Sequence, residues 1–557
     1  MRAYHYLVGA AALSLCNPAS AGEIRGTVTG PDARPVKGAQ VLLDDLARGD
    51  TSGEDGRFVL TQIPSGEIGI TITAPGLAAK HVSVPVSATG SVDLPVKLEA
   101  TDLLDRAAAL YAEPQPEHLA QKKAYLDSIK PIAGRPPNIL LILFDDLGYG
   151  DLSSYGNRLI KTPNIDAVGA RGVRLDRFYS SSPVCSPSRA GLLTGRYPTR
   201  SRAANHVFAA TGGPTAIQRQ SRGWTNALPT DEILLPEILS RAGYRTGAFG
   251  KWHLGDRPGA RPTDLGFDEY FGLLYSNDMS PANVWRGTEI DTPAERMDQS
   301  TLTERITDEA LAFIRGNANR PFFAYVPYTA PHQPHFANPK HRGVSEGGTY
   351  GDVVEDLDVN VGRLIGALKD LKLDDNTIVI VTSDNGGDFG GSVGDLRGRK
   401  AETFEGGQRV PLFVVWPGKI APGTRSEEMA MNIDITPTLL AALGIGLPQD
   451  RIVDGRDIGP LLLHGGPSPH DYLYYLTWTG QYEGVRDRGF KFRDPVPNTR
   501  LLNFRPSGGR PALYVMEEDN ESLDVSAKHP EERSTLERQL EQFRQETSEN
   551  VRGWRTP

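Results

Sequence analysis

Cysteine and long apolar runs are both scarce in this chain of 557 residues. There are two cysteines, Cys16 and Cys185. No segment after residue 21 approaches the length of about 20 apolar residues that a membrane-spanning helix needs. The formal net charge is −9, so there is no excess of positive charge for binding nucleic acid or an anionic membrane. The length and composition predict a loop-rich globular protein of several domains.

The first 21 residues have the pattern of a secretory signal peptide. A basic residue precedes a mostly apolar stretch at positions 6–15, and Ala19-Ser20-Ala21 forms an Ala-x-Ala cleavage site. The alternative is a lipoprotein signal that ends at Cys16, although Leu15 is bulky where a small residue is expected. Cleavage after position 21 leaves Cys185 alone and excludes an internal disulfide. We therefore expect a periplasmic or secreted bacterial protein, with an outer-membrane lipoprotein as the alternative.

Residues 22–99 alternate short apolar runs with turn clusters such as Gly53-Glu54-Asp55-Gly56. The runs predicted as strands lie at 24–28, 41–43, 58–60, 68–73, 81–84 and 92–98. This spacing predicts a small all-β sandwich. Gly26-Thr27-Val28, Pro35-Val36-Lys37-Gly38-Ala39 and Ile63-Pro64-Ser65-Gly66 make the segment similar to the carboxypeptidase regulatory-like domain. That resemblance implies a spacer or adhesion module, with glycan binding as the alternative.

Residues 100–136 are predicted to be a helical linker. Leu103, Leu104 and Leu110 share one helical face, and a second helix is predicted from Glu117 to Ile129. Prolines interrupt the segment and separate it from the next domain.

From residue 137 to about 469 the pattern is α/β. Continuous apolar runs at 139–144, 246–249, 322–326, 377–381 and 412–415 are typical of strands that are buried on both faces. Helical segments are predicted at 234–241, 303–314 and 350–371. This alternation predicts a doubly wound, mainly parallel sheet. Residues 470–557 predict a smaller antiparallel sheet that ends in a polar helix at 531–545.

Polar residues follow four of the predicted strands directly or closely. They are Asp145-Asp146, Lys251-Trp252-His253, His332 and Asp384-Asn385. Ligands of open α/β sheets bind at the carboxyl ends of the strands, so we expect these groups to converge on one crevice. Asp145, Asp146, Asp384 and the amide oxygen of Asn385 form a set of hard oxygen ligands, which predicts a divalent cation, Ca²⁺ or Mg²⁺ rather than zinc.

Cys185 opens the run Cys185-Ser186-Pro187-Ser188-Arg189-Ala190-Gly191-Leu192-Leu193-Thr194-Gly195-Arg196, which resembles the signature of type I sulfatases in the alkaline phosphatase superfamily. Gly250-Lys251-Trp252-His253-Leu254-Gly255 and Leu396-Arg397-Gly398-Arg399-Lys400 resemble two further motifs of that family. In the second motif Arg399 stands where the family more often has glycine. The resemblance implies an alkaline phosphatase-like fold and a sulfuric ester hydrolase.

The resemblance also implies roles for single residues. Cys185 is oxidised to formylglycine by a maturation enzyme, and the hydrate of this aldehyde is the nucleophile and a further ligand of Ca²⁺, with Mg²⁺ as the alternative. Arg189, Lys251 and Lys400 stabilise the sulfuryl oxygens. His332 protonates the departing alcohol, and His253 deprotonates the second hydroxyl of the intermediate, which then expels sulfate.

The substrate is predicted only as a class. His335, Arg399, Asn277, Asp278 and Trp478 are candidate substrate contacts, and the aromatic rings of Trp285, Trp478 and Tyr482 are candidates for stacking on sugar or aryl rings. We expect an aryl or carbohydrate sulfate as substrate. The alternatives are a phosphonate monoester or phosphodiester hydrolase of the same superfamily, and a non-catalytic glycan-binding protein. The oligomeric state stays open.

Overall fold

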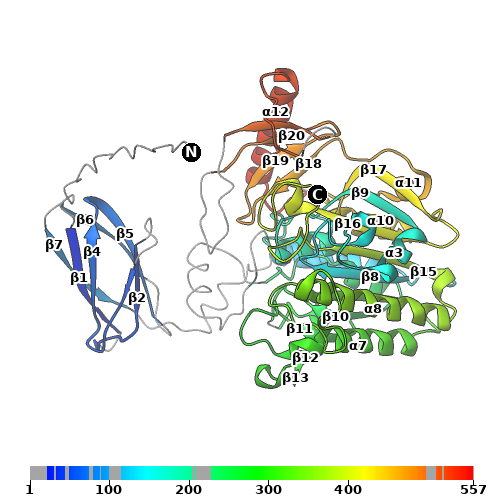
Figure 1. The fold of residues 1–557 in the computed structure, drawn as a ribbon, viewed down its shortest axis with the longest axis horizontal. Coiled ribbons are helices and arrows are strands. Elements are labelled where there is room, and N and C mark those ends of the chain that lie inside the picture. The colour runs from blue at the N-terminus through cyan, green and yellow to red at the C-terminus, as the bar shows by residue number, and fades with distance from the viewer. Residues whose placement is uncertain are drawn as a thin grey trace, which may run out of the picture. The chain divides into compact units, whose positions relative to one another are not determined.

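The computed structural model describes residues 22–30, 33–43, 49–74, 80–87, 90–98, 115–203, 207, 227–256, 258–496, 510–516 and 520–555. These residues fall into two units, one within 22–98 and one within 115–555 (Figure 1). The predicted signal segment at 1–21 and the first predicted helix of the linker lie outside the described residues. The second is observed as α2 (Pro116–Ser128). The domain boundaries stay predictions.

The smaller unit is the predicted all-β sandwich. One sheet contains β4 (Arg57–Ile63), β1 (Gly22–Thr29) and β7 (Ser91–Lys97), and the other contains β3 (Gly49–Thr51), β2 (Gln40–Leu43), β5 (Gly66–Thr73) and β6 (Lys80–Val86). Side chains alternate along β1, and inward residues such as Ile24 and Phe58 share one core with Ile70 and Ile72 of the second sheet. The sequence did not predict β3, because this strand has only three residues and none of them is a large apolar residue.

The larger unit is built on a ten-stranded sheet. The order is β13 (Glu289–Thr292), β12 (Val284–Arg286), β11 (Glu269–Leu273), β10 (Arg245–Lys251), β14 (Phe322–Pro331), β8 (Asn138–Asp145), β15 (Thr377–Ser383), β16 (Arg409–Val415), β9 (Val173–Tyr179) and β17 (Thr424–Met431). The pairings show that β12 and β16 run against the other strands. The sheet is therefore mainly parallel, as predicted.

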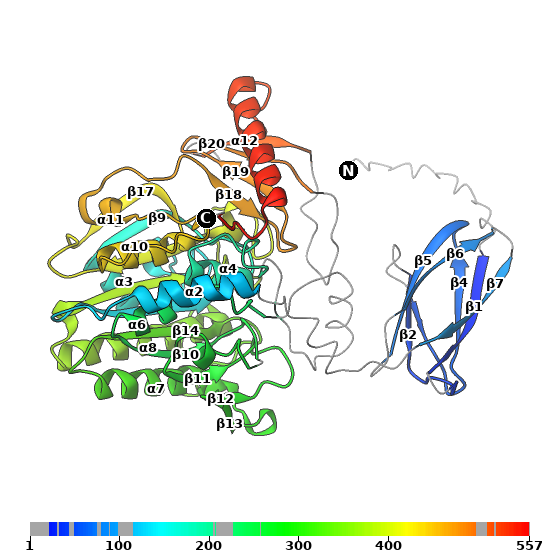
Figure 2. The same cartoon turned by 180° about the vertical axis from the view of Figure 1, so that it is seen from behind.

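The central strand β8 is buried along its whole length because helices cover both faces of the sheet. Leu141 joins the core beneath α4 (Cys185–Thr194), α6 (Leu235–Arg241), α10 (Ile435–Ala442) and α11 (Gly459–His464). Leu140 joins the opposite core, beneath α3 (Pro163–Ala170), α7 (Leu302–Gly316) and α8 (Gly348–Asp370). Figure 1 shows α7 and α8 on one side and Figure 2 shows α4 and α6 on the other. The doubly wound arrangement is thus confirmed.

The predicted antiparallel subdomain consists of β18 (Leu473–Leu476), β19 (Tyr482–Arg486), β20 (Phe490–Arg493) and β21 (Ala512–Val515), in that order. The helix α12 (Pro530–Glu549) packs on this sheet through Leu536 and Leu540. Among the described residues, no helix has the length and apolar character that crossing a bilayer requires.

A buried carboxylate on the short helix α9 (Glu405–Gln408) joins this subdomain to the large sheet. Glu405 accepts hydrogen bonds from Tyr179 Oη of β9 (2.7 Å) and from Lys491 Nζ of β20 (3.0 Å). Lys491 also pairs with Glu521 at 2.9 Å. Burial opposes ionisation of Glu405, but Lys491 and Arg486 outweigh it and lower the pKa of Glu405 to about 2. Two buried carboxylates therefore share the ammonium group of Lys491, and Glu405 has Arg486 as a second, more distant cation.

Replacing Lys491→Met is expected to lower the free energy of unfolding of the larger unit by about 3–5 kcal/mol, because it removes the cation paired with Glu521 and the nearest cation of Glu405, and both carboxylates are buried. Urea denaturation of the purified protein measures the change. Lys419→Met removes an exposed ammonium and serves as the matched control. Equal stability of the two variants would show that the pair does not hold the subdomain in place.

Candidate active site

Four neighbouring parallel strands deliver polar residues to one edge of the large sheet. Asp145 ends β8 and Lys251 ends β10, while His332 follows β14 and Asp384 follows β15. These strands are adjacent in the order β10-β14-β8-β15 and their carboxyl ends coincide. The predicted convergence of these groups is confirmed.

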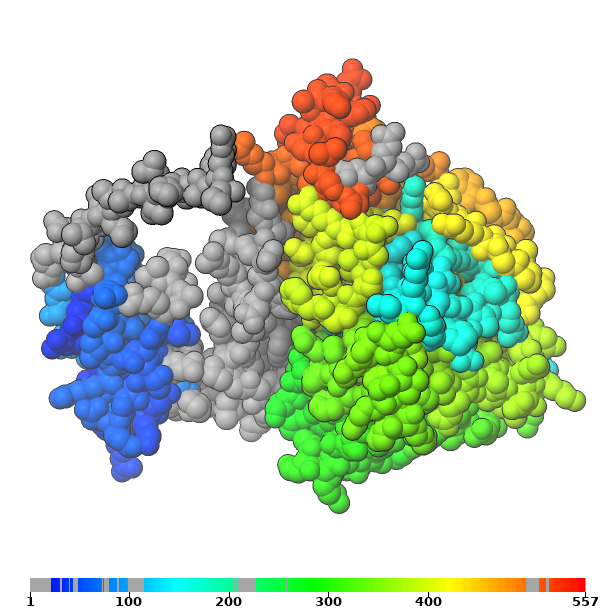
Figure 3. Space-filling view, in the orientation of Figure 1, coloured from blue at the N-terminus to red at the C-terminus, as the bar shows by residue number. Residues whose placement is uncertain are grey.

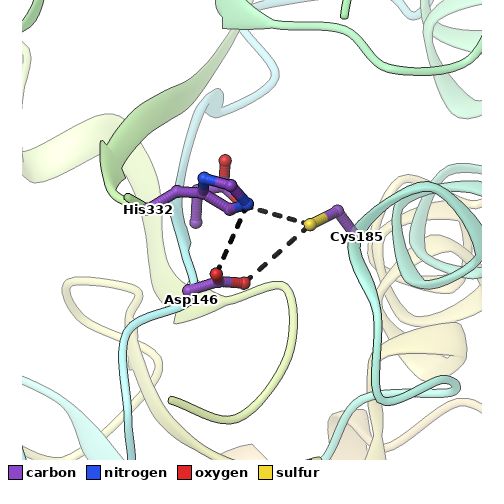
Figure 4. A group of neighbouring side chains, drawn as sticks. Asp146, Cys185 and His332 are labelled. Carbon is purple, nitrogen blue, oxygen red and sulfur yellow. Dashed lines mark hydrogen bonds and ion pairs between the residues drawn. The ribbon is translucent and has the colours of Figure 1, made fainter. Parts of the chain in front are cut away.

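Cys185 reaches the same point from the first residue of α4, every residue of which is buried. Its Sγ lies 3.3 Å from Asp145 Oδ1 and 3.9 Å from Asp146 Oδ1. Figure 4 shows the side chains of Cys185, Asp146 and His332 directed toward a common point. The helix begins at Cys185, so Cys185 and Arg189 lie one turn apart on the same helix face.

The acidic groups fit a divalent cation. One ligand atom from each of Asp145, Asp146, Cys185 and His332 lies within 4.8 Å of the others. Asn385 Nδ2 donates to Asp146 Oδ1 (2.8 Å), whereas its buried Oδ1 has no hydrogen-bond partner in the part of the chain that the structure describes. An orphaned amide oxygen beside two carboxylates is the environment that a hard cation satisfies.

Asp384 is paired with a guanidinium group rather than with an ammonium group. Its Oδ1 accepts the backbone N–H of Asp146 (3.1 Å), and its Oδ2 accepts Nε of Arg189 (2.9 Å). Burial and the neighbouring charge of Asp145 nevertheless raise the pKa of Asp384 to about 7. A bound cation would offset both effects and favour the charged carboxylate.

Three cations surround the carboxylates. Lys251 Nζ lies 2.6 Å from Asp145 Oδ2, and Lys400 Nζ lies 2.6 Å from Asp146 Oδ2. Burial lowers the pKa of both ammonium groups, but the paired carboxylates outweigh it and raise both above the ordinary value. Arg189 donates from Nη1 to the carbonyl of Lys251 (2.6 Å). All three groups stay charged and are positioned for an anion.

The thiol of Cys185 is a poor nucleophile as it stands. Burial and the charge of Asp145 raise its pKa well above the ordinary value, despite the cations nearby. A reactive thiolate needs the opposite environment, with a lowered pKa and partial exposure. The surroundings of Cys185 therefore do not support ordinary cysteine catalysis.

The two candidate histidines differ in position. His332 Nε2 lies 3.6 Å from Asp146 Oδ2, and burial together with the charge of Lys400 lowers the pKa of His332. The hydrogen bond of His253 runs from Nε2 to the carbonyl of Val207 (2.9 Å), and Val207 N donates to Ser186 Oγ (3.1 Å). His253 is thus linked to the residue after Cys185, whereas His332 borders the acidic group directly.

The predicted substrate contacts are found in different environments. His335 is half-buried against the ring of Tyr350, with centroids 5.2 Å apart, and Asp278 is exposed. Arg399 is half-buried and donates to the carbonyls of Asp388 and Gly391. Asn277 is buried and bonded to Gln299 (3.0 Å), which favours a structural role for its side chain.

The aromatic residues predicted to stack on the substrate are more buried than expected, and their stacking stays a prediction. Trp478 is buried in a cluster with Val184 and Ala401, and Tyr482 is buried with its hydroxyl bonded to Thr199. Trp285 is half-buried, and the guanidinium of Arg261 lies over its ring at 5.3 Å. Loop position in the sequence suggested exposure, whereas Trp478 and Tyr482 are buried and Trp285 is half-buried.

Asp151 and Ser276 are site residues that the sequence did not reveal. Buried Asp151 accepts the backbone N–H groups of Gly148 and Ser392 and the hydroxyl of Tyr350, each at 2.6 Å. It thereby ties the loop after Asp146 to the loop after Asn385. Ser276 Oγ receives a second hydrogen bond from Lys251 Nζ (3.0 Å). The sequence offered one indication of a role for Asp151, which is its position five residues after Asp146.

Buried carboxylates paired with three cations at the strand ends of a doubly wound sheet are compatible with an enzyme that acts on an anionic ester. The family described as Sulfatase matches residues 137–445, and the chain belongs to this family. The Carboxypeptidase regulatory-like domain matches residues 23–99, and the family described as N-sulphoglucosamine sulphohydrolase, C-terminal, matches residues 399–548. The predicted family and the predicted sulfatase activity are confirmed.

Similar proteins agree with this assignment. N-acetylgalactosamine-6-sulfatase from Sus scrofa is 40% identical over an alignment of 393 residues, and the match covers 64% of this chain and 74% of that protein. A solved Bacteroides thetaiotaomicron structure, described under the metabolism of multiple glycosaminoglycans, is 26% identical with a TM-score of 0.67 and covers 74% of this chain and 100% of that chain.

The alternative functions find no support. The phosphonate monoester hydrolase SpPMH from Silicibacter pomeroyi is 20% identical with a TM-score of 0.55, covering 74% of this chain and 95% of that chain, and this likeness shows the fold alone. A non-catalytic glycan-binding protein would have lost the cysteine or the acidic residues, and both are present in the pocket.

Proposed function

We propose that this sulfatase releases sulfate from a carbohydrate sulfate, with Cys185 converted to formylglycine and Ca²⁺ bound by Asp145, Asp146, Asp384 and Asn385. The observation that carries the proposal is the environment of Cys185. A buried thiol with a raised pKa lies within 4 Å of two carboxylates and is flanked by two ammonium groups. This surrounding suits a hydroxyl-bearing residue on a cation better than a thiolate.

Formylglycine supplies a hydrated aldehyde as nucleophile, and Ca²⁺ supplies positive charge for it and for the sulfate. The chain's own residues do the rest. Lys251, Lys400 and Arg189 hold the sulfate oxygens and offset the charge that spreads over them as the S–O bond breaks. His332 gives the proton from Nε2 to the departing alkoxide; the negative sulfate ester favours its protonated form against the lowered pKa. His253, linked to Ser186 through Val207, serves as the base that assists sulfate release.

The substrate class is supported by the similar proteins, which include a sulfatase of N-acetylgalactosamine 6-sulfate and a protein of glycosaminoglycan metabolism. The signal-like first 21 residues support export to the periplasm or secretion, and the carboxypeptidase regulatory-like unit supports a surface or spacer role. A maturation enzyme of the host completes the site. Ion chromatography of sulfate released from a panel of sulfated monosaccharides, with 4-nitrophenyl sulfate alongside, tests the class. Turnover of the aryl sulfate alone would contradict it.

Conversion of Cys185 predicts an aldehyde at this position. Mass spectrometry of the tryptic peptide that contains Cys185 is expected to show the aldehyde in active preparations, and Cys185→Ala is expected to reduce kcat on the order of 10³-fold or more, because the nucleophile is lost. Cys185→Ser is the matched control, since it restores a hydroxyl but cannot form the hydrate. A fully active enzyme that carries only the unmodified thiol would refute the mechanism.

The acidic pocket predicts stabilisation by a cation. Removing bound metal with a chelator is expected to lower the midpoint of thermal unfolding, and Ca²⁺ at about 100 times its Kd should restore about 2.7 kcal/mol. Elemental analysis of the purified enzyme distinguishes Ca²⁺ from Mg²⁺. The double variant Asp384→Asn with Asn385→Ala should no longer respond to either treatment. An unchanged midpoint in the unsubstituted enzyme, with no metal by elemental analysis, would exclude the cation site.

A further inference from the structure

Two aromatic side chains that the sequence did not single out are exposed on the loops that follow His332 and Asn385. Phe389 is 77% exposed and Phe336 is 48% exposed. Burial of a large apolar side chain stabilises the folded protein by about 1.5–3 kcal/mol. Two exposed rings on neighbouring loops therefore call for an explanation. The rings that were expected at the pocket, Trp478 and Tyr482, are packed in the interior.

Both rings lie on loops that leave the pocket. Phe336 is four residues after His332, and Phe389 is four residues after Asn385. The two loops follow β14 and β15, which flank β8 on either side in the sheet, so they border Asp145 and Asp146 from opposite sides. The stretch of chain near residue 400, drawn yellow, reaches the surface of the face shown in Figure 3.

The two loops, residues 333–336 and 388–391, form one structural unit that we call the rim. Gln333 Nε2 donates to Asp388 Oδ2 (3.1 Å). Gly390 lies directly against His335, because a Cβ at this position would be 2.6 Å from His335 Cε1 and 2.9 Å from Tyr350 Cδ2. A side chain at position 390 would therefore separate the loops.

Arg399 fixes the second loop and adds positive charge to it. Its Nη1 donates to the carbonyls of Asp388 (3.1 Å) and Gly391 (3.0 Å), on either side of Phe389. Its guanidinium carbon lies 5.7 Å from the centre of the Phe389 ring. The next residue, Lys400, already contacts Asp146 in the pocket. The cationic lining of the pocket thus continues outward to the rim.

We infer that the rim is a binding site for the sugar residues next to the sulfated one, with Phe389 and Phe336 packing on the apolar faces of the rings and Arg399 facing an anionic substituent. The inference rests on the proposed carbohydrate substrate. The catalytic side chains are at most 8% exposed, so we expect them to contact the sulfate group alone and the adjoining sugar units to lie along the loops that follow His332 and Asn385. Aromatic rings at a wet surface offer a flat apolar face to such a partner.

The test compares two lengths of one substrate. The sulfated sugar that the enzyme hydrolyses fastest is supplied as a monosaccharide and as a tetrasaccharide that ends in the same unit, and kcat and KM are measured separately. We expect the unsubstituted enzyme to prefer the tetrasaccharide. Phe389→Ala and Phe336→Ala should each raise KM for the tetrasaccharide about 5- to 10-fold, with kcat and the monosaccharide constants unchanged.

Gly390→Val, which pushes the loops apart, should give the same loss, and Ile290→Ala, which truncates an exposed apolar side chain on β13, should change nothing. Equal kcat and KM for the monosaccharide and the tetrasaccharide in every variant would overturn the proposal that the rim binds sugars. The sulfatase activity would not be affected by this result. Parallel losses on both lengths would place the rings in the sulfate pocket instead. Hydrolysis of 4-nitrophenyl sulfate without hydrolysis of any sulfated sugar would overturn the rim together with the carbohydrate assignment.

Discussion

Three buried carboxylates, Asp145, Asp146 and Asp384, impose the constraint on which the centre of this sulfatase depends. Burying a charge costs several kcal/mol unless partners of opposite charge and hydrogen bonds compensate it. Lys251, Lys400 and Arg189 provide part of that compensation, and each comes from a different segment of the chain. Burial and the charge of Asp145 still raise the pKa of Asp384 to about 7, and a divalent cation bound here would offset both effects. Charge balance therefore fixes the ends of several strands and helices against one another.

Buried ion pairs also connect the site to the C-terminal subdomain. Lys400, which pairs with Asp146, lies five residues before Glu405, which pairs with Lys491 of β20. The loop between them is thus held by a buried ion pair at each end. The antiparallel subdomain belongs to the catalytic machinery for this reason, because it supports the loop that carries one of the pocket's cations.

Secondary structure was predicted correctly where the residues of a single segment show the pattern of a buried strand or an amphipathic helix. The strands β8, β10, β14 and β15 are continuous apolar runs, and the amphipathic helices α7 and α8 were visible from their spacing. The strands β9 and β17 were missed because charged residues such as Arg174 and Asp176 interrupt them; pairing with neighbouring strands and with each other's charges stabilises them instead. Exposure of side chains was also missed, since Trp478 and Phe389 both lie in loops and only packing distinguishes them.

The sequence by itself determined the fold class, the family and the acidic and basic groups of the pocket, because buried strands and reactive motifs are local patterns of residue type. The tertiary structure alone decided how these groups compensate one another, that the thiol of Cys185 is buried with a raised pKa, and which aromatic rings face solvent at the rim. Those properties depend on distances between segments that are far apart in the chain. A pKa or an exposed surface is set by everything that packs around a group, and no local pattern records it.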